Sequence, residues 1–230
     1  MKNEKGIRNE MKRTEGDVAI SGNEIDAVDA YKKAAEEGDI EAQYNLGCCY
    51  LHGNGVDKDK EEAVKWFTKA AEHGHVKAQR FLGLRYCLGL DVQQSYDLAF
   101  KYHFMSAEQG HVDGMKCVAC CYKKGQGVKQ DDVEAAKWTR KVAEQGKIQA
   151  QYELGLYYKK DEGVEQDDAE AAKWFRMAAE QGNTQSQYEL GLCYYEGRGV
   201  EQDDTEAEKW LKKAAEKGHE KARYILNLCF

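Results

Sequence analysis

Apolar side chains recur along the chain at the spacing of short α-helices. Between residues 147 and 182, Ala150, Leu154 and Tyr158 follow one another at intervals of four, which places them on one face of a helix. A polar stretch interrupts this stripe, and a second stripe then passes through Trp174. The pattern predicts two short helices joined by a loop.

The same unit recurs every 36 residues without a gap. Trp138, Trp174 and Trp210 are each 36 residues apart, and other residue types keep that spacing. The recurring positions include Tyr50, Tyr86, Tyr122, Tyr158 and Tyr194, and also Gly74, Gly110, Gly146, Gly182 and Gly218. A period of this length is typical of a solenoid, in which each unit buries its apolar face only against its neighbours. We therefore expect the chain to act through an extended surface.

The 36-residue lattice divides the chain into repeats. We expect residues 1–20 to be disordered or poorly ordered and residues 21–230 to form one solenoid. It consists of a half repeat at 21–38, full repeats at 39–74, 75–110, 111–146, 147–182 and 183–218, and a half repeat at 219–230. The last half repeat leaves Ile225, Leu228 and Phe230 without a second helix to cover them. The helix itself could act as a cap, two chains could meet end to end as a homodimer, or the protein could continue.

Residues that favour helix ends mark the second helix of each unit. Asp167 can accept hydrogen bonds from the first-turn amides, and Glu170, three residues later, can reach back. Gly182 suits the left-handed position that follows the last turn. The loop between the two helices carries glycines, such as Gly197 and Gly199, that permit a positive φ, and a valine follows that can pack against the core.

The consensus A-x3-LG-x2-Y-x2-G-x-GV, followed by D-x3-A-x2-W-x3-AAE-x-G, resembles the Sel1-like repeat, a relative of the tetratricopeptide repeat. The resemblance covers residues 39–218 as five units. A tetratricopeptide unit of about 34 residues fits less well, because its tryptophan lies in the first helix, whereas the tryptophans of this chain lie in the predicted second helices. The resemblance implies an all-α fold, a right-handed α/α superhelical solenoid of helix-turn-helix repeats, with the first helices lining a concave groove.

Two repeats depart from this consensus. In the second repeat, Asp91 replaces a loop glycine and Ser95 replaces the capping aspartate, so we expect a loop of different shape. In the third repeat, Val118 and Ala119 replace Leu-Gly, which weakens the expectation of a close crossing between its two helices.

Composition narrows the functional classes. The chain has no proline and a net charge of −7. The lack of proline favours helix, and the charge disfavours nucleic-acid binding, which needs a basic stripe. No stretch approaches the roughly 20 apolar residues that cross a bilayer. The first residues lack the apolar segment of a secretory signal. We therefore expect a cytoplasmic protein with no nucleic-acid partner and no direct membrane insertion.

Eight cysteines raise the possibility of disulfides or metal binding. Cys193 and Cys229 are equivalent positions of adjacent repeats, about 8–10 Å apart, which is beyond disulfide reach. Cys117 and Cys120 form a C-x-x-C near His111, which could bind zinc or act in redox chemistry, but a second such motif is missing. Secreted relatives, as the resemblance implies, link first to second helices, and here the predicted second helices hold no cysteine. We expect reduced, partly buried thiols, no metal and no cofactor.

The sequence gives no sign of catalytic residues. Aspartate pairs such as Asp131-Asp132 recur at the start of second helices, where capping explains them better than calcium binding or acid–base chemistry. Some relatives are described as β-lactamases, but no serine of this chain is followed by a lysine at the third place. His73, His75 and His219 lie near repeat junctions with no serine or cysteine partner that the sequence can place.

The remaining candidate for function is a mixed row on the first helices, represented by Glu153, Tyr157 and Lys160. The candidate partner-binding residues are Asn45, His52, Phe81, Arg85, Lys124, Glu153, Tyr157, Lys160, Glu189 and Glu196. The alternative is that this row is only a solvated face. The resemblance implies a non-enzymatic scaffold or adaptor that binds a protein or peptide on its concave surface in signalling or complex assembly. The alternative is a secreted or surface Sel1-like protein with host-interaction or β-lactamase-like activity.

Overall fold

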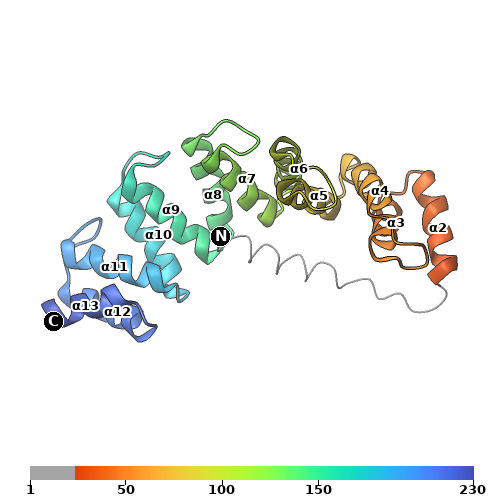
Figure 1. The fold of residues 1–230 in the computed structure, drawn as a ribbon. Coiled ribbons are helices and arrows are strands. Elements are labelled where there is room, and N and C mark those ends of the chain that lie inside the picture. The colour runs from red at the N-terminus through yellow and green to blue at the C-terminus, as the bar shows by residue number, and fades with distance from the viewer. Residues whose placement is uncertain (1–23) are drawn as a thin grey trace. The chain divides into compact units, whose positions relative to one another are not determined.

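The structure is a computed structural model that describes residues 24–230, so the segment 1–20 lies outside the described residues. The described chain is all-α, as predicted (Figure 1). Its helices are α2 (Glu24–Glu36), α3 (Ile40–His52), α4 (Lys60–Glu72), α5 (Val76–Leu88), α6 (Tyr96–Glu108), α7 (Val112–Lys124), α8 (Asp132–Glu144), α9 (Ile148–Lys160), α10 (Asp168–Glu180), α11 (Thr184–Glu196), α12 (Asp204–Glu216) and α13 (Glu220–Cys229). Odd labels are the first helices of the repeats and even labels are the second helices.

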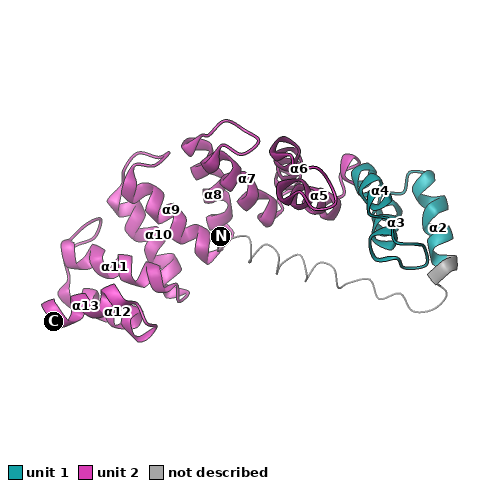
Figure 2. Ribbon diagram, in the orientation of Figure 1, with its two compact units in different colours: residues 1–70 teal, residues 71–230 magenta. Residues whose placement is uncertain are grey.

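The chain divides into two compact units, Met1–Ala70 and Ala71–Phe230 (Figure 2). Unit 1 contains α2, α3 and most of α4, and its core joins Val28 to Leu46 and Trp66. Unit 2 contains α5 to α13, and each of these helices packs against the helix that follows it in sequence. This consecutive packing of short helices confirms the predicted solenoid.

Side chains at the helix ends account for the bounds of the second helices. The Asp167 carboxylate accepts a hydrogen bond from the Glu170 amide at 2.9 Å, and aspartates at the equivalent position cap α4, α8 and α12 in the same way. After α10, Gly182 has a φ of +92°. This left-handed conformation suits glycine, and both predicted helix-end signals are confirmed.

The Glu170 side chain does not reach back to the start of the helix, although the sequence predicted that it would. The Asp167 amide donates to the Tyr158 carbonyl oxygen at 3.2 Å and so needs no second acceptor. The Glu170 carboxylate instead accepts hydrogen bonds from Lys173 at 2.7 Å and from the Trp174 indole at 3.2 Å. Since Trp174 is 6% exposed, this contact ties the first turn of α10 to the core.

The loop of the second repeat keeps the regular backbone, so the expectation of a different shape is wrong. Asp91 has a φ of +60°, close to the values of +69° or +70° at the equivalent glycines 127, 163 and 199. Arg85 donates to the Asp91 carboxylate at 2.7 Å and stabilises this left-handed residue. Ser95 accepts from the Leu98 amide at 3.3 Å and caps α6 as an aspartate would.

The crossing of the two helices within a repeat depends on matched side-chain sizes. A Cβ atom at Gly155 would lie 2.5 Å from the Phe175 ring, so a phenylalanine on the second helix requires a glycine on the first. The third repeat has Ala119 at the glycine position and Thr139 at the phenylalanine position, and α7 still packs against α8. The smaller threonine leaves room for the alanine methyl group, so the crossing persists there.

Candidate partner-binding site

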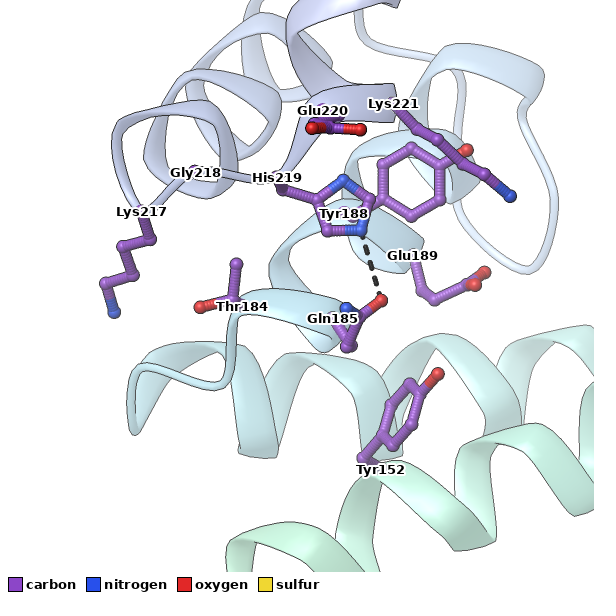
Figure 3. Close-up of a pocket in the computed structure, with 10 residues that line it drawn as sticks. All are labelled: Tyr152, Thr184, Gln185, Tyr188, Glu189, Lys217, Gly218, His219, Glu220 and Lys221. Atoms are coloured by element: carbon purple, nitrogen blue, oxygen red, sulfur yellow. Dashed lines mark hydrogen bonds between the residues drawn. The ribbon is translucent and has the colours of Figure 1, made fainter. Parts of the chain in front are cut away.

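A cavity of about 640 Å³ opens in unit 2 between α9, α11 and the start of α13 (Figure 3). Tyr152 on α9 and Tyr188 on α11 both line it and are 36 residues apart, so equivalent turns of two successive first helices supply them. The turn that precedes α13 adds Lys217 and His219. The cavity is therefore built by the repeat itself, from side chains distant in sequence.

His219 is held by three contacts at the edge of the cavity. Its ring stacks on Tyr188 with 4.3 Å between the ring centroids. Its Nδ1 accepts from the Ala222 amide at 3.2 Å and caps α13, so Nε2 carries the hydrogen that is donated to Gln185 Oε1 at 3.1 Å. Burial and the nearby Lys221 ammonium lower the pKa of His219. His219 therefore presents a neutral, fixed ring at neutral pH.

Two charged groups of the cavity are already engaged within the protein. Lys217 Nζ donates to the Gly182 carbonyl oxygen at 2.8 Å, and the Glu189 carboxylate lies 2.6 Å from Lys159 Nζ. Desolvation raises the pKa of Tyr152, which keeps its phenol protonated. The cavity thus combines aromatic faces and neutral hydrogen-bonding groups with the charged side chains of Glu220 and Lys221.

Comparison with known proteins identifies the repeat. The family model described as the Sel1 repeat matches residues 20–39, 40–75, 76–111, 118–147, 148–183 and 184–219. This chain belongs to the Sel1 repeat family. The predicted resemblance is confirmed, and the matched segments account for most of this Sel1 repeat protein. A comparison with curated proteins finds no match.

Solved structures of Sel1 repeat proteins share this fold. A protective antigen present in uropathogenic Escherichia coli strains, which displays an SLR fold, is 38% identical with a TM-score of 0.70. That match covers 86% of this chain and 43% of the antigen, so the chain spans less than half of that relative. A Sel1 repeat protein from Oxalobacter formigenes is 32% identical with a TM-score of 0.68, over 85% of this chain and 86% of that one.

The ten predicted partner-binding residues are distributed over both units of the Sel1 repeat protein. Asn45 and His52 belong to unit 1, and the others belong to unit 2. Glu189 is the member of the set that lines the cavity. The side chains of His52, Lys124, Glu153, Lys160 and Glu196 are exposed, and those of Asn45, Phe81 and Glu189 are half-buried. Partner binding by these residues stays a prediction.

Two members of the predicted row are buried and cannot meet a partner in this conformation. Arg85 is 7% exposed and its guanidinium lies 4.6 Å from the Phe81 ring centroid. Tyr157 is 4% exposed, Lys123 Nζ lies 4.7 Å from its ring centroid, and desolvation raises its pKa to about 12. The same middle position of the row is buried in the other full repeats, at Cys49, Cys121 and Cys193. Contacts with neighbouring elements cover this position. The periodicity of a single helix shows which residues share a face, but it does not show which faces other elements cover.

Sequence reasoning missed the cavity, although its residues carried a usable signal. From the sequence we proposed no site at Tyr152, Tyr188 or His219, whereas the structure brings the three residues to one cavity. Tyr152, Tyr188 and Tyr224 share one position of the lattice, and His219 immediately precedes a predicted first helix. A row of aromatic residues on successive first helices, beside a capping histidine, could have indicated the site.

The described residues of this Sel1 repeat protein give little support to thiolate chemistry, metal binding or a membrane-spanning helix. Burial raises the pKa of Cys121 to about 12 and that of Cys193 to about 11, which disfavours thiolate chemistry at both. Among residues 24–230, no group of three or more His, Cys, Asp or Glu side chains is arranged to hold a metal ion. No helix in this range combines the length and apolar character that crossing a membrane requires.

Proposed function

We propose that this Sel1 repeat protein is a non-enzymatic scaffold or adaptor that binds a protein or peptide partner in the cavity formed by α9, α11 and α13. The observation that carries this proposal is the convergence of Tyr152, Tyr188 and His219 on one cavity of about 640 Å³. Aromatic side chains with a polar end are enriched at the energetically important centres of protein interfaces. Family membership supports a binding role, since Sel1 repeats typically mediate protein interactions.

The cellular setting of this role is also a proposal. We propose a cytoplasmic scaffold in signalling or complex assembly. The likeness to a protective antigen of uropathogenic Escherichia coli, at 38% identity, favours a surface role in host interaction instead. Antibody labelling of intact and permeabilised cells separates the two, because only a surface protein is labelled in intact cells.

Affinity capture with matched variants tests the binding site. The baits are the wild type, a cavity variant with Gln185→Ala and Tyr188→Ala, and a row variant with Glu153→Ala and Lys160→Ala. Each protein captured by the wild type is then produced alone, and its affinity for the three baits is measured by calorimetry. We expect the cavity variant to bind at least about tenfold more weakly and the row variant to stay within about twofold.

The row variant also serves as a control, because it removes two exposed charged side chains that do not line the cavity. Circular dichroism spectra must show that both variants keep the helical content of the wild type. A partner whose affinity depends on the row pair, or on neither pair, would contradict a site in the cavity.

A further inference from the structure

We propose that Cys117 and Cys121 form a dithiol site for a trivalent organoarsenic compound, whose arsenic atom bridges the two sulfur atoms. The site lies on α7, outside the cavity, and is independent of the proposed function. Among the eight cysteines of the sequence, these are the only two that lie four residues apart. Both are free thiols in the structure.

The helix places the two thiols on one face but too far apart for a disulfide. Residues four apart on a helix have about 5–6 Å between their Cβ atoms. A disulfide needs about 3.5–4.5 Å between the same atoms. An atom inserted between the two sulfur atoms lengthens the link and removes this mismatch. The spacing therefore favours a bridging atom over a disulfide.

Two other thiols lie near the pair, and neither is as good a partner. Burial, followed by the charge of Cys121 and then by that of Cys120, raises the pKa of Cys117, an order that favours Cys121 over Cys120 as the partner. Cys87 on α5 is a partner across the helices that also fits less well, because its position and that of Cys117 are equivalent to Lys159 and Glu189. Those two long side chains meet at 2.6 Å, whereas two cysteines are much shorter.

Burial decides which bridging atom suits the site. Because burial raises the pKa of Cys121 to about 12 and also raises that of Cys117, both thiols are protonated at neutral pH. A monovalent soft cation would bind two thiolates and leave a net negative charge, which is unfavourable in a buried site. Zinc prefers about four ligands, and residues 24–230 hold no group of three suitable side chains. Trivalent arsenic reacts with protonated thiols and leaves a neutral product.

The binding step is a condensation without any change of oxidation state. Phenylarsine oxide in water carries two hydroxyl groups on arsenic. Cys117 is half-buried and reacts first, since Cys121 is 9% exposed. The Cys117 sulfur forms an As–S bond, one As–O bond breaks, and the hydroxyl group leaves as water with the thiol proton. Cys121 repeats the step, so two As–S bonds replace two As–O bonds and arsenic stays trivalent.

Binding of phenylarsine oxide to the full chain, in the presence of the monothiol 2-mercaptoethanol, tests the inference. The arsenic retained after gel filtration is measured by elemental analysis. We expect the wild type to retain an equimolar amount, because the second As–S bond closes within one molecule. Cys117→Ser and Cys121→Ser should each weaken binding at least about a hundredfold. Cys120→Ser and Cys87→Ser are the matched controls and should stay within about threefold of the wild type. Circular dichroism must show that all four variants keep the helical content of the wild type.

Peptide mass spectrometry after alkylation identifies the cysteines that the arsenical protects, and we expect Cys117 and Cys121. Unchanged retention in either Cys117→Ser or Cys121→Ser overturns the inference, as does protection of another pair such as Cys48 and Cys49. A loss in Cys120→Ser equal to that in Cys117→Ser also contradicts it, because the bridge would then span three residues. An adduct that 2-mercaptoethanol removes as readily as the dithiol dimercaptopropanol does would have one sulfur bond and would exclude the bridge.

Discussion

The second and third repeats (α5–α8) and the fourth and fifth repeats (α9–α12) lie in one unit and share one backbone pattern, but they fill the helix crossings differently. In the fourth repeat, Phe175 is fully buried against Gly155. The same position holds His103 in the second repeat and Thr139 in the third. The repeat backbone therefore tolerates an aromatic, a titratable or a small polar side chain at its crossing, and the choice sets the local stability and its dependence on pH.

His103 is the side chain that gives the α5–α8 stretch its distinct chemistry. It is 3% exposed and lies against Gly83, where a Cβ atom would come within 2.6 Å of the imidazole. Within the described residues its Nδ1 has no hydrogen-bond partner. Each stretch also buries an unpartnered serine hydroxyl, Ser106 and Ser186, so the difference between them rests on the histidine. Since a solenoid's stability sums over repeats and their interfaces, α5–α8 should be the more acid-sensitive stretch.

The largest expected effect is the loss of an aromatic crossing. Phe175→Ala removes a fully buried ring opposite Gly155 and leaves a cavity, so we expect the free energy of unfolding to fall by about 3–5 kcal/mol. Thr139→Ala at the equivalent position removes a buried methyl group and a hydroxyl, which donates to the Ala135 carbonyl oxygen at 2.8 Å, and should lower it by about 1–2 kcal/mol. Urea unfolding followed by circular dichroism measures both. Equal losses would mean that the two crossings are packed alike.

The second prediction concerns pH. Burial, and to a smaller extent the nearby Arg80 guanidinium, lower the pKa of His103 from 6.5 to about 4. The unfolded chain therefore binds a proton more readily than the folded one between these values, and stability is present above about pH 6.5 and is lost as the pH falls. From pH 7 to pH 4.5 we expect a loss on the order of 2–3 kcal/mol from this residue.

His103→Phe is the matched control for this pH effect, because phenylalanine already occupies the equivalent positions 67 and 175. The urea unfolding free energies of both proteins are compared at pH 7 and pH 4.5, so that titration of the surface carboxylates cancels. If the wild type and His103→Phe lose the same free energy on acidification, the imidazole is not the acid-sensitive group and the contrast between the two stretches disappears.

A third prediction tests whether glycine and phenylalanine act as a pair. Gly155→Ala forces a methyl group to 2.5 Å from the Phe175 ring and should lower the free energy of unfolding by about 1–3 kcal/mol. In the background of Phe175→Thr, which copies the third repeat, the same change should cost less by about 0.5 kcal/mol or more, because the threonine leaves room. A double-mutant cycle in urea measures this coupling. Additive effects would show that size matching does not explain the third repeat.

The fold could be predicted well because residues close together in sequence determine where each helix begins, where it ends and which face it buries. Asp167 caps the helix that it precedes, Gly182 follows its last turn, and the spacing of Trp174 fixes the buried face. The site needed information that no single helix contains. Tyr157 is buried by groups from outside its own helix. Tyr188 stacks on His219, which lies 31 residues later in the sequence, in the turn before α13. Contacts between repeats decide which first-helix positions remain open, and periodicity alone does not distinguish them.

The smallest expected effect on stability concerns a missing N-terminal cap in the fourth repeat. Lys147 precedes α9 and makes no side-chain hydrogen bond to its first turn, whereas Asn183 at the equivalent position before α11 accepts from the Ser186 amide at 2.8 Å. Lys147→Asn should therefore raise the free energy of unfolding by about 0.5–1 kcal/mol, since an asparagine satisfies a free amide and a cation is unfavourable at a helix N-terminus. Lys147→Met removes the charge without supplying an acceptor and should give less than half of that gain. Thermal and urea unfolding of the three proteins measure the difference, and equal gains for Asn and Met would attribute the effect to charge and contradict the role of the cap.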